Sequence, residues 1–309
     1  MRYIAGIDIG GTTIKLGLFT LYGMLIGMDS VPTDISDKGS RIIRDAADGL
    51  KKLADASSVA LDDIEGAGIG VPGPVRADGL VNGCVNLGWG LTDAAGEFSL
   101  LSGRPAKAIN DANAAALGET WRGSAAGAAS TFFVTLGTGV GGAFVSGGKV
   151  ITGTNGAGGE IGHITVNRAE TAFCSCGRRG CLEQYVSATG ILRAVSAALD
   201  AGEPSSLSGL QEITGKDVFD AAKNGDAVCL QAVDNACRIL GEALAITACI
   251  VDPDIFIIGG GLSGAGDFLI EKVTESYKEA VMYPCRDTPI VAASLGNEAG
   301  MYGAAAQWL

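Results

Sequence analysis

The chain has 309 residues, and 48 of them are glycine, which is about twice the ordinary share. Apolar residues make up 47%, enough for a substantial core, and acidic residues outnumber basic ones by 34 to 22, which argues against nucleic-acid binding. No apolar run reaches the ~18 residues of a membrane span, and residues 1–11 lack the layout of a signal peptide. We therefore expect a cytoplasmic protein without a membrane segment, whose eight cysteines are reduced.

The first part of the chain reads as strands and helices in alternation. Apolar, β-rich segments interrupted by glycine predict a meander, and apolar residues at helical spacing predict the helices. The predicted strands are residues 3–9, 14–21, 24–30, 67–71 and 106–109, and the predicted helices are residues 38–56 and 112–121.

The layout of the opening meander recurs once, from residue 131 onward. The predicted strands there are residues 131–136, 142–145 and 150–151, again separated by glycine turns. A single repeat at this long offset favours two related lobes over a solenoid, although two unrelated glycine-rich meanders would look alike. Residues 182–251 are expected to be mostly helical. A strand at 255–258, a helix at 267–280, a strand at 290–293 and a final helix from about residue 298 complete an α/β fold.

Three glycine-rich turns follow predicted strands. Glycine lets backbone N–H groups approach an anion, and threonine hydroxyls add donors. The residues concerned are Gly10, Gly11, Thr12 and Thr13 with Lys15, then Thr138 and Gly139, and finally Gly259, Gly260 and Gly261. The spacing is neither that of a Walker A loop nor that of a Rossmann fingerprint. Each turn alone is equally consistent with an ordinary hairpin, but the three together favour nucleotide binding. Asp8, at the end of an apolar strand, is costly to bury without a partner.

Asp111 lies between a predicted strand and an alanine-rich helix. It is either a helix N-cap or a general base that takes a proton from a hydroxyl during phosphoryl transfer. A helix N-terminus is expected to lower its pKa and keep it ionised.

Three cysteines and the only histidine form the most specific pattern. Cys174, Cys176 and Cys181 lie within eight residues, and His163 precedes them. A Cys3His set is typical of structural zinc, and a closed set of four ligands leaves no catalytic position. Reduced thiols without a metal are the alternative. The other cysteines, at positions 84, 229, 237, 249 and 285, are expected to be buried thiols.

These motifs together resemble the ROK family of bacterial sugar kinases and sugar-responsive repressors. The resemblance covers nearly the whole chain and rests most strongly on Gly162-His163 followed by residues 174–183, with residues 8–13, 70–74, 110–113 and 137–142 matching in order. It implies the two-lobed, actin-like and hexokinase-like ATPase fold, with duplicated ribonuclease H-like domains and a central cleft. The implied domains are residues 1–112, completed by 296–309, and residues 113–295.

The resemblance also implies roles for individual residues. Asp111 would be the base for the 6-hydroxyl of a hexose, and Asp8 would orient water around Mg²⁺. The glycine turns would hold ATP. Sugar hydroxyls would be bound by Asn82, Asn110, Glu160, His163 and Glu183, with His163 giving one nitrogen to Zn²⁺ and the other to sugar.

The segment 82–89 looks most like the glucokinase branch, which implies glucose as substrate. Another hexose (N-acetylmannosamine, N-acetylglucosamine, fructose or allose), a non-catalytic sugar sensor, and polyphosphate as donor remain alternatives. The family also implies a homodimer. The first strand begins by residue 3, so the N-terminal DNA-binding helices of the family's repressors are not expected.

Overall fold

The computed structural model describes all residues, 1–309, and the chain packs into two compact units. Unit 1 comprises Met1–Ala129, Ala143–Gly158 and Ser294–Leu309, and unit 2 comprises Ser130–Gly142 and Gly159–Ala293. None of the helices is both long enough and apolar enough to cross a membrane. The domain limits implied by the family resemblance stay a prediction, because these units are defined by packing alone.

The first sheet lies in unit 1 and contains the predicted opening meander. Its strands are β1 (Tyr3–Ile9), β2 (Thr13–Thr20), β3 (Leu25–Pro32), β4 (Ile64–Val71) and β7 (Ala106–Asn110). They lie in the order β3-β2-β1-β4-β7, with the meander antiparallel and β1, β4 and β7 parallel.

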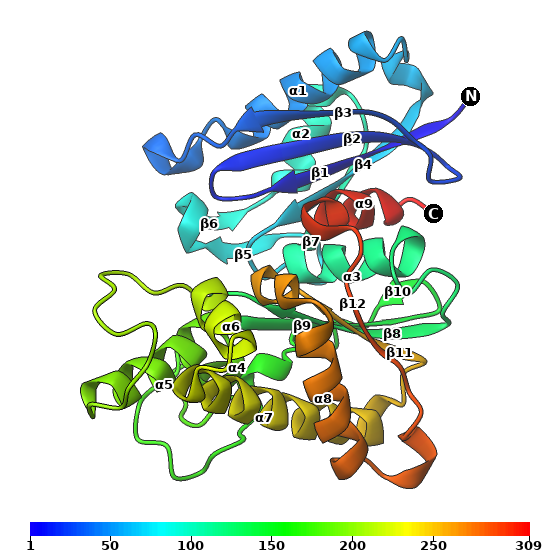
Figure 1. Cartoon of the computed structure of the whole chain (residues 1–309). Coiled ribbons are helices and arrows are strands. Elements are labelled where there is room, and N and C mark those ends of the chain that lie inside the picture. The colour runs from blue at the N-terminus through cyan, green and yellow to red at the C-terminus, as the bar shows by residue number, and fades with distance from the viewer. The chain divides into compact units, whose positions relative to one another are not determined.

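Alternate residues of the strands face two different layers of helices. Ile7, Leu16 and their alternate neighbours pack into the core with α1 (Ile42–Ala56) and α2 (Ala94–Ser102). Ile4 and Phe19 point the opposite way, toward the C-terminal helix α9 (Ala299–Ala306). Figure 1 shows α9 beside this sheet and next to α3 (Asp111–Arg122). The residues of β1 whose side chains point the same way as that of Ile4 therefore face α9 and α3.

Helix α9 fits in this place because glycines line its path. A Cβ on Gly68 of β4 would lie 1.7 Å from the carbonyl oxygen of Ala304, and one on Gly303 would lie 1.6 Å from that of Ala114 in α3. Backbone thus meets backbone on both sides of the helix, and any side chain at these positions would force the elements apart. The high glycine content partly reflects this close packing.

The second sheet repeats the topology of the first. Its strands are β8 (Ser130–Leu136), β9 (Val140–Ser146), β10 (Lys149–Val150), β11 (Ile255–Gly259) and β12 (Ile290–Ala292). The order β10-β9-β8-β11-β12 matches the first sheet strand for strand, with β8, β11 and β12 parallel and β9–β10 antiparallel. The predicted α/β fold of two related lobes is therefore confirmed, and chance likeness of two meanders is excluded.

Unit 2 adds a layer of helices, as the sequence predicts for residues 182–251. They are α4 (Glu183–Val186), α5 (Ala188–Asp200), α6 (Gly215–Lys223), α7 (Ala227–Val251) and α8 (Asp267–Ala280). The long helix α7 packs against α5, α6 and α8 (Figure 1).

Two parts of the sequence prediction need correction. Helix α1 begins at Ile42 and not at residue 38, because Asp37 and Lys38 have φ of 47° and 56°, which a right-handed helix does not allow. Between β4 and β7 the prediction also missed a two-stranded sheet, β5 (Val81–Cys84) with β6 (Trp89–Thr92), and helix α2.

Candidate functional site

Asp8 and Lys15 are direct neighbours on the α9 side of the first sheet. They are paired residues of β1 and β2, and Lys15 donates from Nζ to the carbonyl oxygen of Asn297 at 2.6 Å. Gly300, at the start of α9, leaves room for the Asp8 carboxylate: a Cβ there would lie 2.8–2.9 Å from its carboxyl atoms. Unit 1 therefore holds a carboxylate and an ammonium at paired positions of neighbouring strands.

Burial raises the pKa of Asp8 from 3.8 to about 6; the charge of Lys15 lowers it and that of Asp111 adds to the rise. Between about pH 4 and pH 6 the folded chain thus keeps a proton that the unfolded chain has lost. This residue therefore lowers the free energy of unfolding as pH rises through that window, by up to about 3 kcal/mol.

We expect Asp8→Asn to remove that slope. At pH 7.5, without Mg²⁺ or nucleotide, the free energy of unfolding of the variant should exceed that of the wild type by ~1–3 kcal/mol. The range extends below the full ~3 kcal/mol because the variant also loses the attraction between the Asp8 carboxylate and Lys15. The gain should vanish at about pH 3, which is below both pKa values, so that the wild-type carboxyl is protonated in both states. Urea unfolding at both pH values measures this, and a stability difference that does not change with pH would contradict it.

The turn between β1 and β2 is held by its own backbone. The N–H of Gly10 donates to the carbonyl of Thr13 at 3.0 Å, and the Thr33 hydroxyl donates to the carbonyl of Gly10 at 2.7 Å. Gly11 and Thr12 are exposed at its tip. The turn is a fixed scaffold with an accessible tip, which suits the predicted phosphate loop.

Asp111 is the first residue of α3, and its neighbour Asn110 caps the helix. The Asn110 side-chain oxygen accepts from the N–H groups of Ala112 and Asn113 at 3.0 and 3.2 Å. The Asn110 amide donates to Asp111 Oδ1 at 2.9 Å and to the carbonyl of Gly73 at 3.3 Å. The alternative that Asp111 is the N-cap is therefore wrong, and its carboxylate is oriented by Asn110.

The pKa of Asp111 is raised, not lowered as the helix N-terminus alone predicts. Burial by surrounding atoms is the largest cause, and it outweighs the N–H of Ala112 and the amide of Asn110, which lower the pKa. The residue is still exposed, so water limits the rise. A raised pKa makes the carboxylate a stronger base.

Asn82 lies in β5 and is exposed. It lines a cavity of about 450 Å³ within unit 1, together with Arg76, Asp78, Thr154 and Asn155. Five polar side chains around one hollow suit a hydroxylated ligand.

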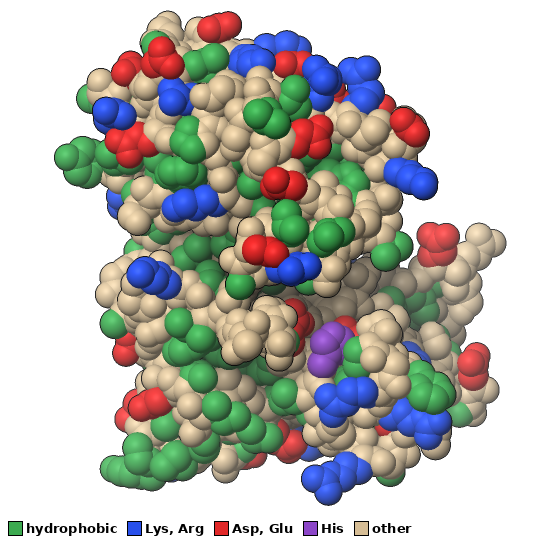
Figure 2. All heavy atoms as spheres, turned by 180° about the vertical axis from the view of Figure 1, so that it is seen from behind, with side chains coloured by type: hydrophobic (Ala, Val, Ile, Leu, Met, Phe, Trp, Pro, Cys, Tyr) green, Lys and Arg blue, Asp and Glu red, His purple; other side chains and the backbone are tan.

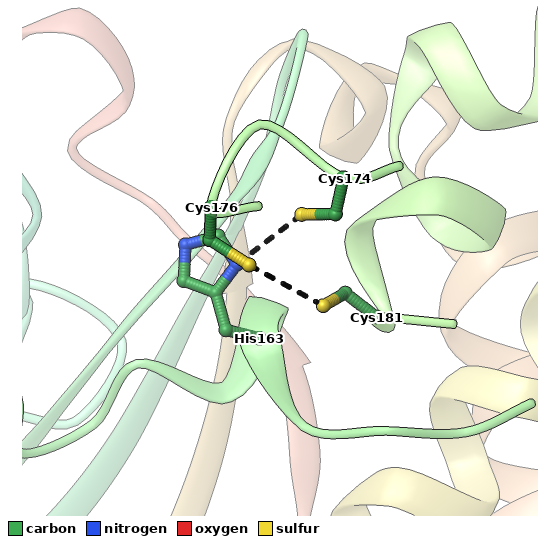
Figure 3. A group of neighbouring side chains, drawn as sticks. All are labelled: His163, Cys174, Cys176 and Cys181. Atoms are coloured by element: carbon green, nitrogen blue, oxygen red, sulfur yellow. Dashed lines mark hydrogen bonds between the residues drawn. The ribbon is translucent and has the colours of Figure 1, made fainter. Parts of the chain in front are cut away.

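The three cysteines and the histidine converge in unit 2, as their spacing predicts. Their donor atoms all lie within 4.8 Å of one another. Figure 3 shows Cys174 and Cys176 on one loop, Cys181 just before α4, and His163 ending the short helical turn η4 (Ile161–His163). Figure 2 shows the histidine at the surface, with basic side chains near it.

The donor set fits Zn²⁺. Zn–S bonds of about 2.3 Å at tetrahedral angles place ligand atoms ~3.7 Å apart. The Sγ atoms of Cys176 and Cys181 are 3.6 Å apart, and Sγ of Cys174 is 3.7 Å from Nδ1 of His163. Burial raises the pKa of Cys174 to about 12, so a metal must displace its proton. Gly177 and Gly180 have φ of 80° and 72° and allow the tight turns between the ligands.

Glu183 is attached to this cluster. Its Oε1 accepts from the Ser175 hydroxyl at 2.8 Å and from the Cys174 thiol at 2.9 Å, and it lies 3.8 Å from Nδ1 of His163. Burial raises the pKa of Glu183, but these hydrogen bonds outweigh it, so the net shift is downward. Glu160 is exposed just before η4. Ser175 was not among the predicted site residues, because its small hydroxyl gives no sequence signal beyond its place between two cysteines.

The two other predicted glycine turns are neighbours within unit 2. A Cβ on Gly260, whose φ is +83°, would lie 2.5 Å from the carbonyl oxygen of Leu136, which precedes the turn containing Thr138 and Gly139. The start of α5 supports that turn, because the Thr189 hydroxyl donates to the carbonyl of Thr138 at 2.8 Å. Gly259 ends β11 and Gly261 begins the next helical turn.

The remaining cysteines are buried as expected, with one exception. Cys249, on α7, is exposed, so the prediction of a buried thiol is wrong there.

Comparison with known proteins identifies relatives along the entire chain. The sequence model of the ROK family matches residues 4–309. A glucokinase of Halalkalibacterium halodurans is 39% identical over 98% of this chain and 93% of its own. Among solved structures, the ROK hexokinase of Thermus thermophilus is similar at 30% identity, TM-score 0.85, with 99% of this chain and 97% of that one covered. A ROK family glucokinase of Streptomyces griseus, solved with glucose and AMPPNP, is similar at 30% identity, TM-score 0.77, with 98% of each chain covered.

Proposed function

Since the chain belongs to the ROK family, we propose that it is an ATP-dependent glucokinase, which transfers the γ-phosphoryl group of ATP to the 6-hydroxyl of glucose. This proposal rests on the position and orientation of the Asp111 carboxylate. Its carboxylate begins a helix that Asn110 caps, so it is oriented and remains available to a substrate. The similarity to a glucokinase solved with glucose and AMPPNP supports the same substrates.

In the proposed reaction Asp111 accepts a hydrogen bond from the 6-hydroxyl and takes its proton as the oxygen attacks phosphorus. Asn110 keeps the carboxylate in place through the 2.9 Å bond. Phosphoryl transfer depends chiefly on positioning and on charge stabilisation, so a fixed base and fixed phosphate ligands account for most of the chemistry.

On the family resemblance we propose that the three predicted glycine turns bind ATP. In unit 1 the exposed tip of the first turn and Lys15 would supply donors and a positive charge, and Asp8 would orient water around Mg²⁺. In unit 2 the supported turn at Thr138 and Gly139 would supply backbone N–H groups. Of the adjacent glycines 259–261, Gly260 lets the chain pack against Leu136, and Gly261 faces open space in which adenosine would lie.

The residues proposed to bind sugar hydroxyls follow from the family resemblance. Asn82 and Asn110 belong to unit 1, and Glu160, His163 and Glu183 to unit 2. His163 turns Nδ1 toward the cysteines, which leaves Nε2, on the other side of the ring, for a sugar hydroxyl.

We propose that Zn²⁺ is bound by His163, Cys174, Cys176 and Cys181. The ion supplies structural cross-linking, because four protein ligands complete its coordination. Ser175 lies between two of these ligands and donates a hydrogen bond to Glu183, so the ion would fix both residues. On the family resemblance alone we further propose a homodimer in the cytoplasm.

A panel of acceptors and donors tests the proposed function. With MgATP, the purified chain should phosphorylate glucose with a kcat/KM at least tenfold above that for N-acetylmannosamine, N-acetylglucosamine, fructose and allose. Replacing ATP by polyphosphate should abolish the reaction. A preferred acceptor other than glucose would reassign the substrate, and a chain that binds sugar without turnover would be a sensor.

A further inference from the structure

Glu119 is a charged residue with no exposed surface, and neither the motifs nor the proposed mechanism accounts for it. Its exposed fraction is 0%, and it alone among the charged residues is fully buried. It lies on α3, about two helical turns after Asp111. A buried carboxylate is costly unless several donors compensate its charge.

Four donors surround the Glu119 carboxylate, and they come from two segments of unit 1. Oε1 accepts from the N–H of Leu295 at 2.8 Å. Oε2 accepts from the N–H of Ser124 at 2.8 Å and from the N–H and hydroxyl of Ser294 at 3.2 and 3.3 Å. Gly123 makes room, since a Cβ there would lie 1.9 Å from Oε2.

The segment that Glu119 holds leads directly to the Asp8–Lys15 pair. The chain re-enters unit 1 at Ser294 and reaches α9 at residue 299. Between these points the carbonyl of Asn297 accepts from Lys15, and Gly300 then packs on the Asp8 carboxylate. Residues 294–300 are thus fixed at their start by Glu119, and at their end they contact both Lys15 and Asp8.

We propose that Glu119 is a positioning residue for the phosphate end of the nucleotide site. By fixing residues 294–295 it sets the position of the Asn297 carbonyl, and through that carbonyl the Lys15 ammonium. This inference rests on the proposed function, in which Lys15 binds phosphate.

The test is Glu119→Gln, which keeps the size of the side chain but turns an NH₂ group toward N–H donors. We expect the Kd of Mg–AMPPNP, titrated calorimetrically without sugar, to rise about 10- to 100-fold, because small displacements of a ligating group have effects of that order. The Kd of glucose should change less than twofold. Glu97→Gln, an exposed glutamate on α2 in the same unit, is the matched control and should change neither constant.

A double-mutant cycle separates positioning from general damage. In a Lys15→Met background, Glu119→Gln should raise the nucleotide Kd less than twofold, because the group it positions is gone. Equal effects in both backgrounds, or a parallel loss of glucose affinity, would overturn the proposal. If Glu119→Gln does not fold, Glu119→Asp, which keeps the charge but shortens the reach, is judged by the same criteria. Nucleotide binding is measured without turnover, so a wild type that phosphorylates no sugar would refute the proposed function and leave this test intact.

Discussion

Asp111→Asn is expected to lower kcat by about 10²–10⁴-fold while the Kd of glucose changes less than about threefold. Asparagine has the same shape and can still accept the hydrogen bond from the N–H of Ala112, so the local structure and the sugar contact survive. It cannot take a proton from the 6-hydroxyl. Steady-state kinetics and calorimetric glucose binding measure the two quantities separately.

The dependence of kcat on pH tests the role of Asp111 independently. Because the pKa of Asp111 is raised, wild-type kcat should fall as pH decreases through that pKa and the base becomes protonated. The variant should lack this acidic limb. Asp55→Asn, an exposed aspartate on α1, is the control and should retain both rate and profile. Near-normal turnover of the Asp111 variant would remove this residue from the role of base.

Cys176→Ser is expected to remove the zinc ion and to weaken glucose binding by about 10- to 100-fold. The wild type should contain about one zinc per chain. Cys176 is exposed, so the substitution itself loses little packing, and the loss of sugar affinity would follow from the released loop with Ser175 and Glu183. Elemental analysis and glucose titration measure these effects. The Kd of Mg–AMPPNP should be unchanged, because the predicted phosphate ligands lie outside the loop.

Cys249→Ser provides the matched control, because Cys249 is also exposed but lies on α7, outside the cluster. It should keep both the zinc and the glucose affinity. If the wild type contains no zinc after purification without chelators, or if both serine variants behave alike, the assignment of a zinc site fails.

Strong local patterns allowed most of the fold to be predicted. Apolar, β-rich segments and glycine turns indicated the strands of both meanders, and their repetition predicted two related lobes, which the matching strand order of the two sheets confirms. The region between β4 and β7 was missed because β5 and β6 have only four residues each, too short for a periodic signal. The start of α1 was placed too early, because a sequence does not reveal the positive φ of Asp37 and Lys38.

The same distinction holds for the candidate site, where residues with a specific local pattern were predicted and residues defined by tertiary packing were not. The convergence of His163 with three cysteines was predictable because metal ligands require particular residue types at close spacing. The contact of Lys15 with Asn297 was not, because it uses a backbone carbonyl that any residue would supply. Glu119 resembles an ordinary surface glutamate of a helix, and only the packing of α3 against the returning chain reveals that it is buried.

Phosphorus NMR of a reaction containing the purified chain, MgATP and glucose shows whether this chain phosphorylates the 6-hydroxyl of glucose with ATP. We expect ADP and glucose 6-phosphate to accumulate in equal amounts, and neither to form with the Asp111→Asn variant on the same timescale. A phosphate ester at another hydroxyl, or ADP without any sugar phosphate, would contradict this expectation.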